Sequence, residues 1–467
     1  MRRYCIIKRP VSRPNVPLPA QRPHRKLTIF TLLGACWALA ATAAQAQIDS
    51  RANVERAVGL IDHGEHTLAR SYLAPALIDP RLSPHERSRA YYLRGYSFFA
   101  EAFYVSASKD YYRALEFNPD NPAALAALGN LHLRGLGVTR APEIAYQLFS
   151  QAAHHGHIGA RFQVAVAEIN AIGTAGDLES ARRWLEDLAE QGHARALVHL
   201  GRSFRQGIAD QPDPQVAKRW YERAWQAGDP EGLVGLAFMH QTGEFGQANV
   251  ERAIELFNQA AAAGSGNAQV SLGHMYLTGE SLGQDYGKAL ALFKQAAELG
   301  VPAAYLWLGH IFEAGLGVKP NLPAAESWYR KAVSNDVAPA LTPLIYLLLA
   351  KDTLRDDREA LSLLAKAAQT DNPQAHNDYA WVLATHLQPT LRNGELALQH
   401  AEQAVAMEAT PTYLDTLAAA YAELGDFANA IATQEAALEL LDDAQRDLKA
   451  ELENRLAVYR AGQAWRE

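Results

Sequence analysis

Small and apolar residues recur through the middle of this chain with a period of 36 positions. One small residue, which we call the anchor, marks each period, at Gly129, Ala165, Gly201, Ala237, Gly273 and Gly309. The next step falls on Ile345. Alanine follows every anchor by 16 positions, and an aromatic residue or leucine follows by 20, at Phe149, Leu185, Tyr221, Phe257, Phe293 and Tyr329. A fixed spacing of this length indicates a tandem array of supersecondary units.

Each period predicts a hairpin of two helices. The first helix carries the anchor, because a small side chain lets a neighbouring helix approach closely. Six positions past the anchor lies a residue suited to a left-handed turn, at Gly135, Ala171, Gly207, Gly243, Gly279 and Gly315. The second helix, such as residues 324–333, has apolar residues at helical spacing. Because one hairpin cannot bury its apolar face alone, the units are expected to stack into a solenoid.

Two segments carry the repeated pattern most completely, "LGHIFEAGLGVKPNLPAAESWYRKAV" at 308–333 and "LGHMYLTGESLGQDYGKALALFKQAAELG" at 272–300. This pattern resembles the Sel1-like repeat family, a relative of the tetratricopeptide repeat. The resemblance implies an all-α fold, a right-handed α-solenoid of stacked helical hairpins.

The flanking segments are similar to the tetratricopeptide repeat itself, most clearly "YYRALEFNPDNP" at 111–122 and the stretch 413–440. We therefore expect four parts beyond the leader: tetratricopeptide-like repeats over 50–121, a Sel1-like array over 122–375, further tetratricopeptide-like repeats over 376–442, and a capping helix over 443–467.

The first 46 residues have the features of a signal peptide. Eight basic residues and no acidic ones precede the apolar run 27–44, and "AQA" at 44–46 suits cleavage after Ala46. The alternatives are lipidation at Cys36, which ends a lipoprotein-like "LGAC", and an uncleaved anchor. All three place the body of the protein outside the cytoplasm, and simple cleavage predicts a periplasmic or secreted protein.

Charge and cysteine usage narrow the function classes. The formal net charge is −7, and without residues 1–46 the chain keeps 36 basic and 51 acidic residues, a net charge of −15. This argues against a nucleic-acid partner, since phosphate contacts need clustered basic charge. Both cysteines, Cys5 and Cys36, lie in the leader. The mature chain would therefore have no disulfide, no cysteine-ligated zinc and no cysteine nucleophile.

The sequence offers few candidates for catalysis or metal binding. The densest group of metal-ligand side chains is His154, His155 and His157, which surround Gly156 between two repeats. Histidines solvated at a helix terminus explain the same residues, because a histidine favours the C-terminal end of the helix dipole. Neither a Ser-His-Asp set nor a pair of carboxylates can be placed. We predict no metal, no cofactor and no enzymatic activity.

Tetratricopeptide repeats bind ligands on the concave face, and the resemblance implies that residues one, four and five past the anchor line it. With Arg195 added, this register and its neighbours give the candidate protein-binding residues Arg195, Arg202, Arg205, Gln206, Phe238, Gln241, His274, His310 and Glu313. Three of them form an arginine cluster in an acidic protein. Guanidinium groups bind carboxylates in pairs of hydrogen bonds, so an acidic peptide or an anionic polysaccharide is the expected ligand. An ordinary solvated helix face explains the same arginines.

These features predict a non-enzymatic scaffold of the cell envelope that binds protein partners. Similarity to Sel1-type scaffolds of exopolysaccharide export implies a place in a secretion or regulatory complex, with possible outer-membrane association. The alternative is a small-ligand binder or a hydrolase-like enzyme, related to the cell wall or to β-lactams, that uses the same groove. The absence of cysteine from the mature chain counts against the β-lactam precedent, which concerns cysteine-rich arrays.

Overall fold

The computed structural model describes residues 50–208, 211–351, 353–441 and 446–467, and this part of the chain contains α-helices and short 3₁₀ turns but no strand. The all-α repeat fold is thereby confirmed. None of the described helices is long and apolar enough to span a bilayer. The expected signal peptide, with Cys36 and Ala46, lies outside the described residues.

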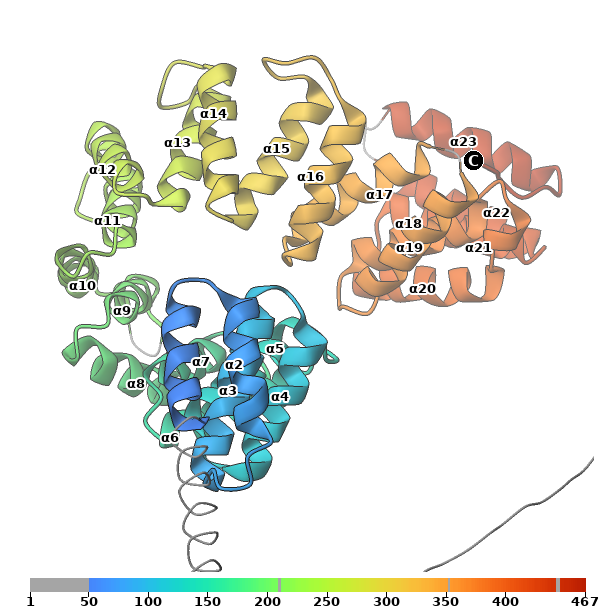
Figure 1. Ribbon diagram of the computed structural model, residues 1–467. Helices are drawn as coiled ribbons and strands as arrows, with labels where there is room; N and C mark the ends of the chain where they lie inside the picture. The colour runs from blue at the N-terminus through green and yellow to red at the C-terminus, as the bar shows by residue number, and fades with distance from the viewer. Residues whose placement is uncertain (1–49, 209–210, 352, 442–445) are drawn as a thin grey trace, which may run out of the picture. The chain divides into compact units, whose positions relative to one another are not determined.

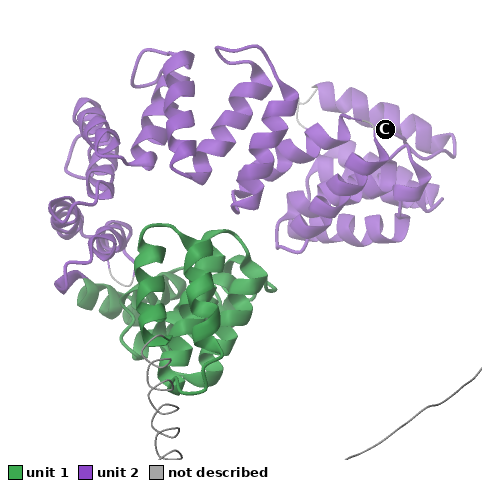
Figure 2. Cartoon of the chain, in the orientation of Figure 1, with its two compact units in different colours: residues 1–188 green, residues 189–467 purple. Residues whose placement is uncertain are grey.

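The chain divides into two compact units, residues 1–188 and 189–467 (Figure 2). In the first unit, residues 50–62 are helical. The helices that follow are α2 (His66–Leu77), α3 (Pro84–Ala100), α4 (Tyr104–Phe117), α5 (Pro122–Arg134), α6 (Pro142–His154), α7 (Ile158–Ile169) and α8 (Leu178–Glu190), which ends just past the unit boundary.

The second unit holds the rest of the array, in which neighbouring helices pair as antiparallel hairpins (Figure 1). Its first six helices are α9 (Ala194–Gln206), α10 (Pro214–Gln226), α11 (Glu231–Thr242), α12 (Val250–Ala262), α13 (Gly266–Thr278) and α14 (Tyr286–Glu298). They are followed by α15 (Pro302–Ala314), α16 (Leu322–Ser334), η1 (Ala338–Ala340), α17 (Leu341–Leu349), α18 (Leu354–Ala367) and α19 (Pro373–Thr385). The last elements are η2 (Pro389–Leu391), α20 (Gly394–Met407), α21 (Pro411–Glu423), α22 (Phe427–Glu439) and α23 (Arg446–Arg460).

Anchor glycines let a ring from the second helix lie against the backbone of the first. A Cβ atom on Gly201 would stand 2.6 Å from the ring of Tyr221, and one on Gly309 would overlap the ring of Tyr329. Tyr329 is 0% exposed. The 20-residue spacing therefore brings the ring of the second helix against the anchor of the first helix in the same hairpin.

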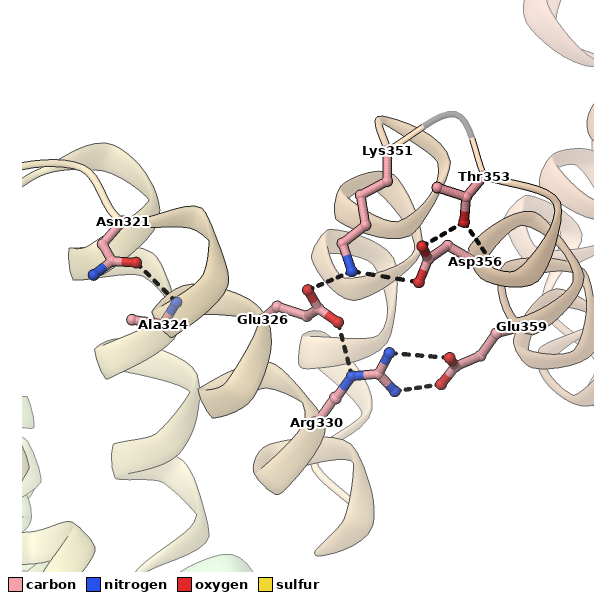
Figure 3. A network of polar contacts seen from close by, with 8 residues as sticks. All are labelled: Asn321, Ala324, Glu326, Arg330, Lys351, Thr353, Asp356 and Glu359. Carbon is pink, nitrogen blue, oxygen red and sulfur yellow. Dashed lines mark hydrogen bonds and ion pairs between the residues drawn. The ribbon is translucent and has the colours of Figure 1, made fainter.

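The glycine six positions past the anchor ends the first helix, as expected. Gly315 has φ +70° and its N–H donates to the carbonyl oxygen of Ile311. The second helix then begins at a capping side chain, such as Asn321, whose Oδ1 accepts from the N–H of Ala324 at 3.1 Å (Figure 3). A left-handed glycine and a polar cap thus set both ends of the turn.

The hairpin of α17 and α18 departs from this pattern. The 3₁₀ turn η1 takes the place of a first helical turn, and α17 has 9 residues where α15 has 13. At about 1.5 Å of rise per residue, α17 is shorter by about 6 Å. Its anchor position holds the buried Ile345, the residue 20 positions later is Ala365 rather than an aromatic ring, and Leu364 of the second helix belongs to the same buried cluster.

Charged side chains join this divergent hairpin to α16 (Figure 3). Arg330 forms a two-pronged ion pair with Glu359 of α18 and also contacts Glu326 at 3.0 Å. Lys351 lies 2.7 Å from Glu326 and 3.3 Å from Asp356. The second helices α16 and α18 are therefore linked by charge, in addition to the rings that lie against the anchor glycines Gly129, Gly201, Gly273 and Gly309 within their own hairpins.

Candidate binding surface

Two arginines and a histidine share one face of α9. Arg195, His199 and Arg202 are spaced by four and three residues, so they lie above one another on the helix. Both arginines are exposed, and neither has an ion-pair partner among the described residues. Burial lowers the pKa of His199 to about 4, and the charges of Arg202 and Arg195 act in the same direction. The histidine is neutral at pH 7, and the patch carries two positive charges.

Arg205 does not join this patch. Its Nε donates to Oε1 of Glu244 at 2.7 Å, and its guanidinium carbon lies 5.8 Å from the ring centroid of Phe238. The hydroxyl of Thr242 donates to the same carboxylate oxygen at 2.8 Å. Arg205 and Phe238 are thus brought together, but as a link between α9 and the end of α11. The expected cluster of three arginines is in the structure a pair beside a bridging arginine.

His310 and Glu313 meet at the hydroxyl of Tyr329. This hydroxyl donates to Oε2 of Glu313 and lies 2.9 Å from Nδ1 of His310. A phenol has one hydrogen, so Nδ1 of His310 must donate to the hydroxyl oxygen. Burial lowers the pKa of His310 and raises that of Tyr329. The three groups form a closed hydrogen-bonded set whose histidine is uncharged.

Tyr221 occupies the same position in its repeat as Tyr329, 20 residues past the anchor. Arg202 and Arg205 stand one and four residues past their anchor, as His310 and Glu313 do. Burial raises the pKa of Tyr221, and the charges of Arg205 and Arg202 oppose that rise. The residues one and four past the anchor thus contact the hydroxyl of Tyr329, and at Tyr221 the same two positions hold arginines.

His274 and His310 flank the ring of Trp307. The ring centroid of His274 is 4.8 Å from that of Trp307, which lies 5.7 Å from that of His310. Trp307 stands two residues before its anchor, as His199 does. Sequence reasoning missed this position, although helical spacing places it on the same face as the residue one past the anchor.

The remaining expected residues make no close contact that defines a site. Gln206 is exposed at the end of α9, and Gln241 is half-buried near the end of α11. The face formed by the first helices of the hairpins, which we call the first-helix face, thus holds one open charged patch and one closed hydrogen-bonded set.

The histidines near Gly156 do not converge. Nδ1 of His157 accepts from the N–H of Ala160 and caps α7, whereas Nδ1 of His154 donates to the carbonyl of Ser150. His155 lies 3.3 Å from Asp120. Among the described residues, no group of three or more histidine, cysteine, aspartate or glutamate side chains is arranged to hold a metal ion.

Solved structures of several bacterial proteins are similar to this chain. One is the Escherichia coli protein c5321, described as a protective antigen with an SLR fold, at 21% identity, covering 91% of this chain and 94% of that chain with a TM-score of 0.43. A Sel1 repeat protein from Oxalobacter formigenes has 29% identity, 50% and 98% coverage, and a TM-score of 0.39. The immunity protein Pa5087 from Pseudomonas aeruginosa has 17% identity, 47% and 83% coverage, and a TM-score of 0.38. No curated protein sequence matches the chain.

The Sel1 repeat description matches seven segments that together span more than half of the sequence, at 122–157, 160–193, 194–229, 230–265, 266–301, 302–337 and 345–371. Sel1 repeats are typical of protein–protein interaction scaffolds, and the family is generally non-enzymatic. On this evidence the chain belongs to the Sel1 repeat family.

Proposed function

We propose that this protein is a non-enzymatic scaffold of the cell envelope that binds a protein partner on the first-helix face of its solenoid. The observation that carries the proposal is the pair of exposed arginines, Arg195 and Arg202, without acidic partners among the described residues of a strongly acidic chain. An unpaired guanidinium is hydrated and available, whereas Arg205 is held by Glu244.

The ligand chemistry follows from this patch. Two guanidinium groups about two helical turns apart match carboxylates of an acidic peptide segment, and each can form paired hydrogen bonds with one of them. The neutral ring of His199 adds a surface between them without adding charge. His274, His310, Glu313 and Phe238 extend the same face through the following repeats, with Gln206 and Gln241 as further polar contacts.

The location and the larger assembly belong to the same proposal. The basic, apolar leader supports export, with cleavage after Ala46. An exported scaffold with an anion-binding face suits a complex that secretes or regulates an anionic exopolysaccharide, in which the acidic partner is a protein component or the polymer itself. Association with the outer membrane would then follow from the partner.

The test is affinity purification of the tagged full chain from envelope extract, with bound proteins identified by mass spectrometry. The variant Arg195→Glu/Arg202→Glu reverses the patch. Its matched control, Arg219→Glu/Lys294→Glu, makes the same charge change at exposed positions of the second helices α10 and α14. We expect one defined partner that the patch variant loses and the control retains.

The affinity is then measured with the purified chain and the purified partner. Loss of two charge-assisted contacts should weaken the affinity for that partner by about tenfold or more. Equal capture of the partner by both variants would show that the partner does not bind at this patch. No capture by the wild-type chain would contradict the proposal that the protein is a scaffold.

A further inference from the structure

A cavity lies beside the divergent hairpin. Its volume is about 710 Å³, and its walls come from α17, α18, α19 and the last residue, Glu467. The apolar part of the lining includes Leu341, Ile345, Leu349, Leu364, Trp381 and Val382. Tyr346 and Leu387 stand at the same cavity and are each 61% exposed. The shortened α17 leaves this space beside α19.

The charged groups of the lining are all of one sign, apart from one histidine. Asp357, Asp378 and Glu467 line the cavity, and the lining contains neither lysine nor arginine. Asp357 is 2% exposed and lies 3.6 Å from Nε2 of His386. Glu467 accepts from the indole N–H of Trp381 at 2.9 Å. Two of the three carboxylates therefore already have partners inside the chain.

Asp378 has no cationic partner among the described residues. Its Oδ1 accepts only from amides, at 2.6 Å from Gln374 Nε2 and 3.3 Å from Asn377 Nδ2. The hydroxyl of Tyr413 donates to Oε1 of Gln374 at 3.2 Å and so fixes the amide that holds the carboxylate. Burial raises the pKa of Asp378. The half-buried carboxylate of Asp378 is therefore held in place by neutral donors and has no neighbouring cation to compensate its charge.

Another buried carboxylate of the chain, close to this cavity, is paired with an arginine. Arg455 pairs with the buried Asp415 at 2.9 Å, and its guanidinium lies 5.3 Å from the ring of Trp381. This combination of carboxylate, tryptophan and guanidinium is favourable, because the ring face attracts a cation. At the cavity the carboxylate of Asp378 and the ring of Tyr346 are present, and the described lining residues supply no lysine or arginine to meet them.

We propose that this cavity receives a lysine or arginine side chain carried by an otherwise apolar segment of a protein partner. The apolar walls bury the flanking side chains, and the charged head meets Asp378. A basic peptide is the occupant we infer from charge complementarity, since the described lining combines apolar walls with Asp378, whose carboxylate accepts only from amides, and contains no lysine or arginine. This site is separate from the arginine patch of α9 and has the opposite charge preference.

The test selects ligands from random sequences, so the partner need not be identified beforehand. Phage-displayed random dodecapeptides are panned against the full chain, and an enriched sequence is synthesised with a fluorescent label for anisotropy titration. We expect enriched peptides to contain lysine or arginine beside large apolar residues. Asp378→Asn should weaken binding of the labelled peptide by about tenfold or more, and the exposed control Asp371→Asn by less than about twofold.

A second variant tests the site without changing Asp378, so a misfolded Asp378 variant cannot decide the result. Thr342→Lys places a cation on an exposed part of the lining and should abolish binding of the basic peptide by repulsion. Arg195→Glu/Arg202→Glu should bind the peptide as the wild-type chain does, which separates this proposal from the scaffold proposal. Enrichment of acidic or uncharged peptides, equal binding by Asp378→Asn, or self-association of the chain through this cavity would overturn the inference.

Discussion

The hairpin of α15 and α16 and the hairpin of α17 and α18 follow each other in the chain but pack in opposite ways. In the first, the glycine anchor Gly309 leaves room for the buried ring of Tyr329. In the second, the bulk lies on the first helix at Ile345, and the second helix offers Leu364. The first arrangement brings the helices close and leaves a polar surface. The second leaves an apolar cavity.

This difference shows how one repeat family produces different surfaces without changing its fold. In the hairpin of α15 and α16, the ring of Tyr329 fills the space between the helices, and its buried hydroxyl contacts His310 and Glu313, one and four residues past the anchor. The ring of Phe257 remains buried in the hairpin whose anchor is Ala237, whereas at the larger Ile345 no ring follows and the surface becomes a recess. Divergence from the repeat pattern is therefore a signal for a binding site as well as for the end of an array.

The largest expected effect comes from filling the space under an anchor. Gly309→Ala would overlap the ring of Tyr329, which is buried and cannot move outward. We expect the free energy of unfolding to fall by about 1–3 kcal/mol, measured by urea denaturation. The control is Gly283→Ala, where a Cβ meets nothing within 4 Å. A similar small change for both variants would contradict the role of the ring.

The second prediction concerns the hydroxyl of Tyr329. Tyr329→Phe keeps the ring under Gly309 but leaves His310 and Glu313 without their shared partner. The expected loss is about 1–2 kcal/mol in the same denaturation experiment, since each group can partly reach water. Stability equal to that of the wild-type chain would mean that the hydrogen-bonded set contributes nothing.

Acid sensitivity should distinguish the regular repeats from α17, which contains no histidine. The pKa of His199 is about 4 in the folded chain, against 6.5 for an ordinary histidine. Above pH 6.5 the group is neutral in both states and has no effect. As the pH falls from 6.5 to 4, the unfolded chain gains a proton that the folded chain does not, so stability decreases.

His199→Gln should therefore flatten the fall of the thermal midpoint over this pH range. Parallel midpoint curves for the variant and the wild-type chain would contradict the assigned shift.

The smallest effect is expected where the cavity is filled. Ala375→Leu adds volume to the lining next to Asp378, where space already exists. We expect unfolding to change by less than about 1 kcal/mol, in contrast with Gly309→Ala, while binding of the selected basic peptide is lost. A large destabilisation would show that the lining is closed in solution.

Much of this architecture could be predicted from the sequence, because a repeat is a local pattern. The period, the hairpins and the left-handed glycines such as Gly315 all follow from spacing. The pairing of Arg205 with Glu244 could not be predicted, since it joins two repeats through a residue in a turn that the register leaves unassigned. His199 and Trp307 were missed because the register taken from tetratricopeptide repeats covers positions one, four and five past the anchor, and these two residues stand two before it.

The cavity at α17 was the least accessible to sequence reasoning. It arises from what the repeat lacks, namely a glycine at position 345 and a full-length first helix, and a missing pattern does not show what replaces it. Asp378 also belongs to the next hairpin, so the site appears only when neighbouring units are assembled.

Hydrogen–deuterium exchange of the full chain tests the central claim most directly, because it reports the protection of α15 and α17 in one experiment. If a ring under a glycine closes the regular hairpin and its loss opens the divergent one, buried amides of α17 should exchange about tenfold faster or more than those of α15. Equal protection of the two helices would contradict the account, since the divergent hairpin would then be as tightly packed as the regular one.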